Sequence, residues 1–226
     1  MNQNSKHFRA VRRLAALVLA AALLWMAALP ALAEGAENAQ SDTIYINSTT
    51  DLLRFAQNCA VDSWSKGKTV ILQENLSLEG VEWEPIPSFS GYFRGNGHTI
   101  RDLELEGSYS PAGLFAIVEK DAVVESLSVQ GWIAPGGEKG TIGGIAGVNK
   151  GTLTSCQFSG GVEGGTEVGG IVGRNEETGV LDRCISHCVV SGKSSTGGIA
   201  GQNAGSITSC TNMGAVNADY QDSTLN

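Results

Sequence analysis

Histidine, proline, aromatic side chains and basic charge are all scarce in this sequence. Its 226 residues include 3 His and 5 Pro, and aromatic residues make up 6%. Beyond Ala33 only His98 and His187 remain, whereas a tetrahedral zinc centre needs several converging histidine, cysteine or acidic ligands. Neither His-Glu-x-x-His nor Leu-Pro-x-Thr-Gly occurs. The sequence therefore predicts no metal centre, no cofactor, no zinc-peptidase motif and no sorting signal of that form.

The segment 1–33 has the three parts of a secretory signal peptide. The basic part comprises Lys6, Arg9, Arg12 and Arg13. An apolar run over 14–29 follows, and the small residues Ala31 and Ala33 stand at the positions that a signal peptidase reads. Because this run is shorter than the about 20 apolar residues that a membrane-spanning helix needs, we expect cleavage between Ala33 and Glu34 rather than retention as a membrane anchor.

Cleavage would leave a strongly acidic product. The signal holds four of the 15 basic residues and none of the 23 acidic ones, which leaves 11 basic residues and a net charge of −12. Such a surface repels phosphate backbones, so we expect no nucleic-acid partner. No later stretch is apolar and long enough to cross a bilayer. The sequence therefore predicts a secreted or extracellular protein, free or associated with the cell surface.

Composition divides the chain into five segments. The signal peptide is 1–33, and a flexible, polar mature N-terminus is 34–43. An N-terminal cap with the first strands is 44–90, glycine-rich repeats fill 91–217, and a polar tail is 218–226. Within the cap, N-cap residues precede an amphipathic helix of two to three turns, with short strands on either side of it.

A repeated block is the strongest pattern in the sequence. Gly-Gly-Ile-x-Gly, followed two positions later by Asn, occurs three times at nearly equal intervals. Its positions are Gly143, Gly144, Gly147, Asn149, Gly169, Gly170, Gly173, Asn175, Gly197, Gly198, Gly201 and Asn203. Each repeat is too short to bury its own apolar face and gains a core only by stacking on its neighbours. The Asn positions recur in register, which favours a stacked amide ladder over three unrelated loop residues.

A second apolar position recurs in five units. We expect it to form a core ladder of Leu103, Leu127, Cys156, Cys184 and Cys210. Because the position also accepts leucine, its cysteines are interpreted as small buried hydrophobes. Two alternatives stay open: a disulfide, which an oxidising compartment permits, and a metal site, for which Cys184-x-x-x-Cys188 is a weak spacing.

These features predict an all-β, right-handed parallel β-helix with a short N-terminal capping helix. The repeats leave no room for a long helix, and a propeller blade would need about 40 residues. Stacked turns of two or three short strands satisfy the pattern, with five to seven turns about 4.8 Å apart. We expect glycine to occupy the left-handed corners between strands.

Several stretches resemble the GLUG motif repeat. They are 113–116, 143–156, 169–190 and 197–216. The stretch 91–105 resembles the first coils of right-handed β-helices of the pectate-lyase-like class. The resemblance covers 44–217 and implies a bacterial surface or secreted protein with a non-catalytic β-helix, as in the N-terminal region of IgA-specific metallopeptidases. Such proteins carry further domains, so we expect either a short secreted form or a fragment of a longer protein.

Three functions fit these expectations. The first is a binding or adhesion module for host or cell-surface glycans or proteins, of unknown oligomeric state. The second is a carbohydrate-active enzyme, which would need clustered carboxylates. Asp102, Glu104 and Glu106 alternate along a predicted strand and, with Glu125 on the next turn, form either an acidic patch or a solvated face. The third is a stalk that spaces a partner domain from the cell. The scattered acidic residues favour the first hypothesis and predict a protein that is not an enzyme.

Overall fold

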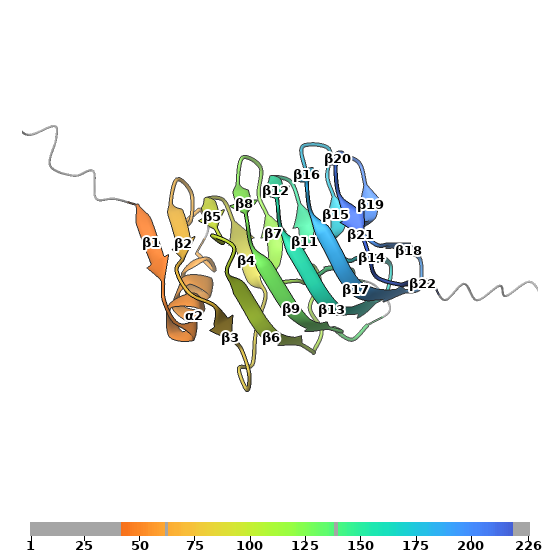
Figure 1. Cartoon of the computed structure of the whole chain (residues 1–226), viewed down its shortest axis with the longest axis horizontal. Helices are drawn as coiled ribbons and strands as arrows, with labels where there is room; N and C mark the ends of the chain where they lie inside the picture. Colours follow the sequence, from red (N-terminus) through yellow and green to blue (C-terminus); the bar gives the residue numbers. More distant parts are fainter. Residues whose placement is uncertain (1–41, 62, 138–139, 219–226) are drawn as a thin grey trace, which may run out of the picture. The chain divides into compact units, whose positions relative to one another are not determined.

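The chain between Thr43 and Ala218 winds as a parallel β-helix, in which successive coils stack on one another (Figure 1). The computed structural model describes residues 42–61, 63–137 and 140–218. The signal peptide with its cleavage site at Ala33 and Glu34, most of the expected flexible segment and most of the polar tail lie outside these residues. The predicted parallel β-helix with a short N-terminal helix is confirmed.

Four sheets run along the β-helix and take strands from successive coils. The first sheet contains β1 (Thr43–Ile46), β2 (Thr69–Leu72), β5 (Tyr92–Arg94), β8 (Val123–Glu125), β12 (Thr152–Thr154), β16 (Val180–Asp182) and β20 (Ser206–Thr208). The second sheet contains β3 (Leu76–Ser77), β6 (Thr99–Leu105), β9 (Ser128–Ile133), β13 (Gln157–Gly164), β17 (Ile185–Gly192), β21 (Thr211–Asn212) and β22 (Val216–Ala218). The third sheet contains β4 (Ile86–Phe89), β7 (Phe115–Val118), β11 (Ala146–Asn149), β15 (Val172–Asn175) and β19 (Ala200–Asn203). The fourth sheet contains β10 (Thr141–Gly143), β14 (Glu167–Gly169) and β18 (Ser195–Gly197).

The strand pairs within each sheet are parallel, so the backbone of one coil hydrogen-bonds to the next coil. The cap segment belongs to the same β-helix, because β1 pairs with β2 and β2 pairs with β5. Thr43, placed by composition in the flexible segment, is the first residue of β1. The change of composition at Gly91 therefore marks no change of fold.

Helix α2 (Thr49–Asn58) covers the first coils. Its N-cap is Ser48, whose Oγ accepts a hydrogen bond from Asp51 N at 3.2 Å. The ring of Phe55 lies 5.9 Å from that of Phe89 and 6.0 Å from that of Phe93, which places an aromatic cluster under the helix. No helix in the described part of the chain has the length and apolar character that a membrane crossing requires.

Apolar side chains fill the interior until the last described coil. Leu181 and Val190 are fully buried, whereas their neighbours in the last coil, Ile207 and Val216, are 38% and 42% exposed. The residues that continue the core columns thus lack a described coil above them. This end of the stack presents both apolar surface and unpaired strand edges.

Glycine occupies only some of the left-handed positions, namely Gly67, Gly80, Gly97, Gly107, Gly137 and Gly160. None of the nine glycines in the three repeated blocks has a positive φ. The recurring corner after the first sheet instead has φ between 51° and 54°, at Asn96, Ser126, Ser155, Arg183 and Ser209. The N–H groups of Ser126, Ser155 and Arg183 each donate to the next coil at 2.9–3.0 Å, and these bonds offset the strain of the left-handed conformation. The expectation of glycine at these corners was therefore wrong.

The repeated glycines serve close approach between backbones. A Cβ on Gly143 would lie 2.5 Å from Val172 Cα and 2.6 Å from Gly173 N, both in the next coil. A Cβ on Gly147 would lie 2.6 Å from Ala112 N, in the preceding coil. Gly173 and Gly201 are equally close to the strands β10 and β14. The third and fourth sheets therefore pack with almost no side chain between them.

We predict that Gly143→Ala lowers the free energy of unfolding by about 2 kcal/mol or more, because the new methyl group overlaps fixed backbone. Urea denaturation of the mature chain measures this. Gly136→Ala is the matched control: its Cβ would have Gly107 O at 3.5 Å as nearest neighbour, so a change within about 0.5 kcal/mol is expected. Equal stability of the two variants would contradict the close-approach explanation.

Candidate functional site

The repeated asparagines form a ladder along the ends of β11, β15 and β19. Asn149 Nδ2 donates to Asn175 Oδ1 at 2.8 Å, and Asn175 Nδ2 donates to Asn203 Oδ1 at 2.8 Å. Each Nδ2 also donates at 3.2 Å to the carbonyl of the glycine that follows, which is Gly151, Gly179 or Gly205. Asn149 and Asn175 are fully buried. Because buried amides need partners, the ladder stabilises one register of the coils.

Leu127, Cys156, Cys184 and Cys210 occupy one column of the stack. The residues that directly follow them pair in register from β9 to β13, β17 and β21. Cys156 and Cys184 are fully buried and all five cysteines are free thiols. Cys184 N donates to Cys210 Sγ at 3.3 Å, and Cys184 Sγ donates to Leu153 O at 3.5 Å. The thiols fill the interior between coils as small hydrophobes do.

Leu103 does not belong to this column. Leu103 pairs with Gly131 on β9 rather than with Leu127. The partner of Val124 on β8 is Phe93 on β5, so the first unit is aligned differently from the later units. Two features displace the first unit: the longer corner 95–98 and a register shift between Ile100 and Leu103. The spacing Ile100-x-x-Leu103 imitates the repeat because this irregularity places two buried side chains three positions apart. The predicted core ladder was therefore wrong at Leu103.

The environment of four of the thiols favours their protonated form. Burial raises the pKa of Cys59 to about 12. Hydrogen bonding with Cys156, followed by burial, raises the pKa of Cys184, and burial raises the pKa of Cys188 and Cys210. A nucleophilic or metal-bound cysteine needs the thiolate. No group of three metal-ligating side chains is gathered within the described residues.

Of the two alternatives for these carboxylates, the acidic patch that includes Glu125 is not formed. Glu125 lies on β8 in the first sheet and its Oε1 is 3.3 Å from Arg94 Nε. Asp102 accepts a hydrogen bond from Ser77 Oγ at 2.6 Å and pairs with Arg101 at 3.1 Å. Glu104 lies on β6 directly beside Trp132 of β9. Glu125 is separated from Asp102 and Glu104 because it belongs to a different sheet.

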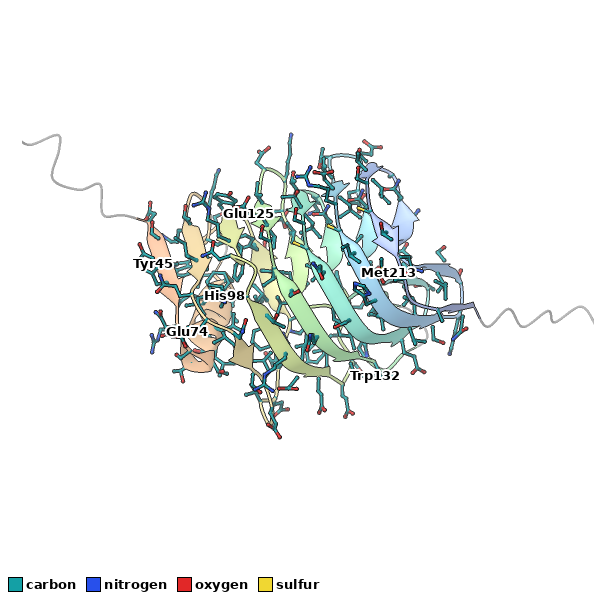
Figure 2. All side chains as sticks on the ribbon, in the orientation of Figure 1. Tyr45, Glu74, His98, Glu125, Trp132 and Met213 are labelled. Carbon is teal, nitrogen blue, oxygen red and sulfur yellow. The ribbon has the colours of Figure 1, made fainter. Side chains whose placement is uncertain are left out.

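Trp132 is the feature that the sequence analysis missed. Its side chain is 51% exposed on the outer face of the second sheet (Figure 2). In the next strand it lies beside Gly161, where an added Cβ would be 2.8 Å from Trp132 Cη2 and still closer to two other ring atoms. The indole therefore covers Gly161 and turns its other face to solvent. The available signal was a large aromatic residue at an outward position, just before the buried Ile133.

A groove of about 570 Å³ lies beside this indole. Gly131 and Gly160 are part of its lining, and an added Cβ at either position would overlap the backbone of the preceding strand. Its lining comprises Glu79, Gly80, Asp102, Leu103, Glu104, Gln130, Gly131, Trp132, Ser159 and Gly160. A second hollow of about 300 Å³ adjoins it, since Glu104 lines both, and contains Glu106 and Tyr109. Together they form an open groove whose lining, among the described residues, includes carboxylate, amide, hydroxyl and aromatic groups and no basic side chain.

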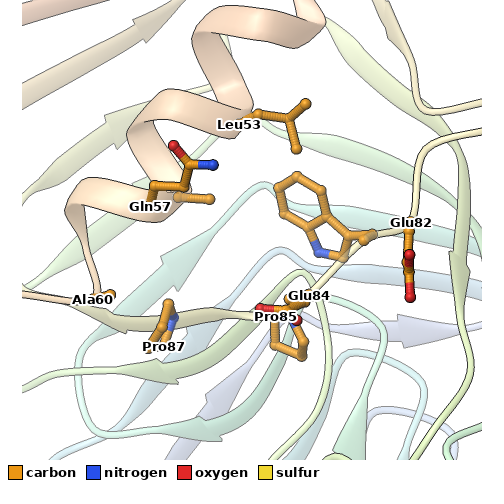
Figure 3. Close-up of a pocket in the computed structure, with 9 residues that line it drawn as sticks. Leu53, Gln57, Ala60, Glu82, Glu84, Pro85 and Pro87 are labelled. Atoms are coloured by element: carbon orange, nitrogen blue, oxygen red, sulfur yellow. The ribbon is translucent and has the colours of Figure 1, made fainter.

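Another hollow lies between α2 and the segment 82–87 (Figure 3). Its volume is about 310 Å³, and Leu53, Gln57 and Pro85 are among the residues that line it. Trp83 separates it from the hollow at Tyr109, because the indole lines both. The buried Nε1 of Trp83 has no hydrogen-bond partner in the described part of the chain. An unsatisfied buried donor of this kind lowers the stability of the fold by about 1–3 kcal/mol.

The described residues bring together no nucleophile and base. Ser159 and His187 are neighbours on the outer face of the second sheet, yet no hydrogen bond joins their side chains within the described part of the chain. His98 lies in a corner where its N–H donates to Gly95 O at 2.8 Å and its carbonyl accepts from Ser128 N at 3.1 Å.

Fold and groove define the class: a repeat protein of the parallel β-helix type. No protein-family model matches the sequence. The chain is similar to halomucin of Haloquadratum walsbyi, 30% identical over 149 residues that cover 60% of this chain and 2% of that protein. It is also similar to an Evansella cellulosilytica protein provisionally described as a Gly-rich membrane protein, 28% identical over 139 residues, 44% of this chain and 16% of that one. The chain therefore corresponds to a small part of either relative's length.

Among solved structures, the chain is similar to a Bacteroides ovatus protein provisionally described as an immunoglobulin A1 protease. The two share 17% identity with a TM-score of 0.47, over 76% of this chain and 67% of that one.

We predict that Asn175→Ala lowers the free energy of unfolding by about 2–4 kcal/mol. The variant removes the hydrogen bonds that this amide donates and leaves Asn149 Nδ2 without its side-chain acceptor. Asn203→Ala, at the exposed end of the ladder, is the control and should cost about 1 kcal/mol. Chemical denaturation followed by circular dichroism compares the two, and equal losses would argue against a cooperative ladder.

We also predict that, in the reduced mature protein, one thiol reacts quickly with a disulfide reagent at pH 8. Cys210 is partly exposed, whereas the other four thiols are buried, and burial slows thiolate formation. All five should react after denaturation, and Cys210→Ser should remove the fast phase. Rapid reaction of three or more thiols in the folded protein would contradict a closed cysteine column.

Proposed function

We propose that this chain is an exported β-helix module of GLUG-like repeats that binds a ligand outside the cell and catalyses no reaction. The segment 1–33 supports export, since it has the features of a cleaved signal. The description of the Evansella relative as a membrane protein supports a place at the cell surface. The proposed partners are surface glycans or proteins, with no cofactor and no nucleic acid.

The exposed indole of Trp132 beside an open groove is the observation that carries this proposal. Large aromatic side chains are normally buried in cores or in interfaces. Here the ring is fixed on its inner side by Gly161 and is free on its outer side. A rigid, pre-positioned aromatic surface loses little conformational entropy on binding, which suits a recognition site.

A carbohydrate-active enzyme is the alternative with a specific observation in its favour, namely the carboxylates Glu79, Asp102 and Glu104 in the groove. Glycoside hydrolysis requires a pair of carboxyl groups with separate acid and base roles. Asp102 is already held by Arg101 and Ser77. The binding role is therefore the better supported of the two.

The test uses purified mature chain, residues 34–226, on arrays of immobilised glycans and extracellular proteins, beside an assay for uronate release from polysaccharides. We expect saturable binding to at least one glycan or protein, without product release, and no binding to DNA. Because the assay detects cleavage independently of binding, the two roles give different results.

Release of uronate above the background of heat-denatured protein would contradict the binding proposal and support a carbohydrate-active enzyme. Absence of binding to every surface on both arrays, in a protein shown by circular dichroism to be folded, would leave the stalk role instead.

A further inference from the structure

The groove beside Trp132 has a defined chemical character. One wall is a flat apolar ring, and beside it stand the amide of Gln130, the hydroxyl of Ser159 and the carboxylate of Glu104. No hydrogen bond or ion pair with another described residue engages the Glu104 carboxylate. The groove therefore combines one apolar face with acceptor groups whose hydrogen-bonding capacity is free.

A pyranose ring is complementary to this arrangement. Its C–H face is apolar and can lie on the free side of the indole, while its hydroxyl groups point outward from the ring edge. Those hydroxyls are donors, and a carboxylate accepts them in charge-assisted hydrogen bonds that are stronger than neutral ones. Ser159 and Gln130 can both donate and accept, which suits a rim of mixed hydroxyl groups.

Charge limits the kind of sugar. The lining contains three carboxylates, at Glu79, Asp102 and Glu104, and no basic residue. A uronate, sialate or sulfate would meet repulsion from these carboxylates, because the neighbouring Arg101 is already paired with Asp102 and the mature chain is acidic as a whole. Neutral sugars avoid this repulsion and use the carboxylates as acceptors.

The length of the groove favours more than one sugar unit. Glu104 lines both adjoining hollows, and the second contains the half-buried ring of Tyr109. That ring packs on Gly107, where an added Cβ would be 3.1 Å from Tyr109 Cε2. Two aromatic side chains, each in contact with a glycine, thus line adjoining hollows that share Glu104.

We propose that this groove binds a neutral oligosaccharide, with one sugar ring stacked on Trp132, a hydroxyl of that ring donating to Glu104, and the chain continuing toward Tyr109. The inference rests on the proposed binding function and specifies its ligand and its site. It assigns Trp132 and Glu104 as contact residues, and Gly161 as the residue that positions the indole.

The test is titration of mature chain with neutral gluco-, manno- and xylo-oligosaccharides, followed by calorimetry and tryptophan fluorescence, with oligogalacturonate as the anionic comparison. We expect binding of at least one neutral series with a change in indole emission, and none of the uronate. Trp132→Ala should weaken binding about 30-fold or more, the loss typical of a central aromatic contact. Glu104→Gln should weaken it less, because the amide still accepts one hydrogen bond.

Two further variants separate contact from folding. Tyr45→Ala removes an aromatic side chain that is 53% exposed on β1, outside the groove, and should bind as the parent does. Gly161→Ala keeps Trp132, but its new methyl group overlaps the ring and displaces it. This variant should weaken binding although the indole is present. Thermal unfolding of Trp132→Ala close to that of the parent excludes misfolding as the cause.

The negative outcomes are distinct. Neutral-sugar binding that survives Trp132→Ala overturns this site and leaves the binding function in place. Binding that depends on Trp132 but selects basic peptides over every sugar overturns the ligand class, since cations also favour an indole beside carboxylates. Binding to no sugar and no protein surface overturns the proposed function itself.

Discussion

Close contact between successive coil backbones is the constraint on which the rest of this structure depends. Parallel strands must approach to about 4.8 Å to hydrogen-bond, and the third and fourth sheets must also pack face to face. Side chains at Gly143 or Gly147 would enter the backbone of a neighbouring coil. The repeated glycines are therefore required by contact between coils rather than by conformational freedom. Each coil buries its apolar residues only because the next coil can reach it.

Where the sequence repeats closely, it predicted the structure well. The blocks at Gly143, Gly169 and Gly197 fixed the order of three coils, and the Asn positions between them defined an internal amide ladder, because equal spacing places equal residues on top of one another. Nothing comparable marked the first unit. The longer corner 95–98 and the irregularity before Leu103 changed the register there, and spacing alone does not distinguish an irregular strand from a regular repeat.

The corners and the groove were harder to predict for different reasons. Ser126, Ser155, Arg183 and Ser209 have left-handed backbones, although serine and arginine carry no signal as specific as glycine for this conformation. The groove joins residues from different coils, and their neighbours are known only once the register is known. Glu104 and Trp132 are a whole coil apart in the sequence, yet they are partners across adjacent strands. A one-residue error in register would have placed Trp132 inside the core.

Glycine residues allow close contact between coils in the interior, and they also shape the outer face of the second sheet. Gly131 and Gly160 line the groove, and Gly161 lies under the indole of Trp132, where an added Cβ would overlap the ring. The next strand differs on this face, since the exposed Val189 takes the position of Gly161 there. A repeat needed only for stacking would tolerate an ordinary polar residue in place of Trp132. An exposed aromatic ring that packs on a glycine of the neighbouring strand adds little to the core. This is the physical reason to assign Trp132 to ligand recognition.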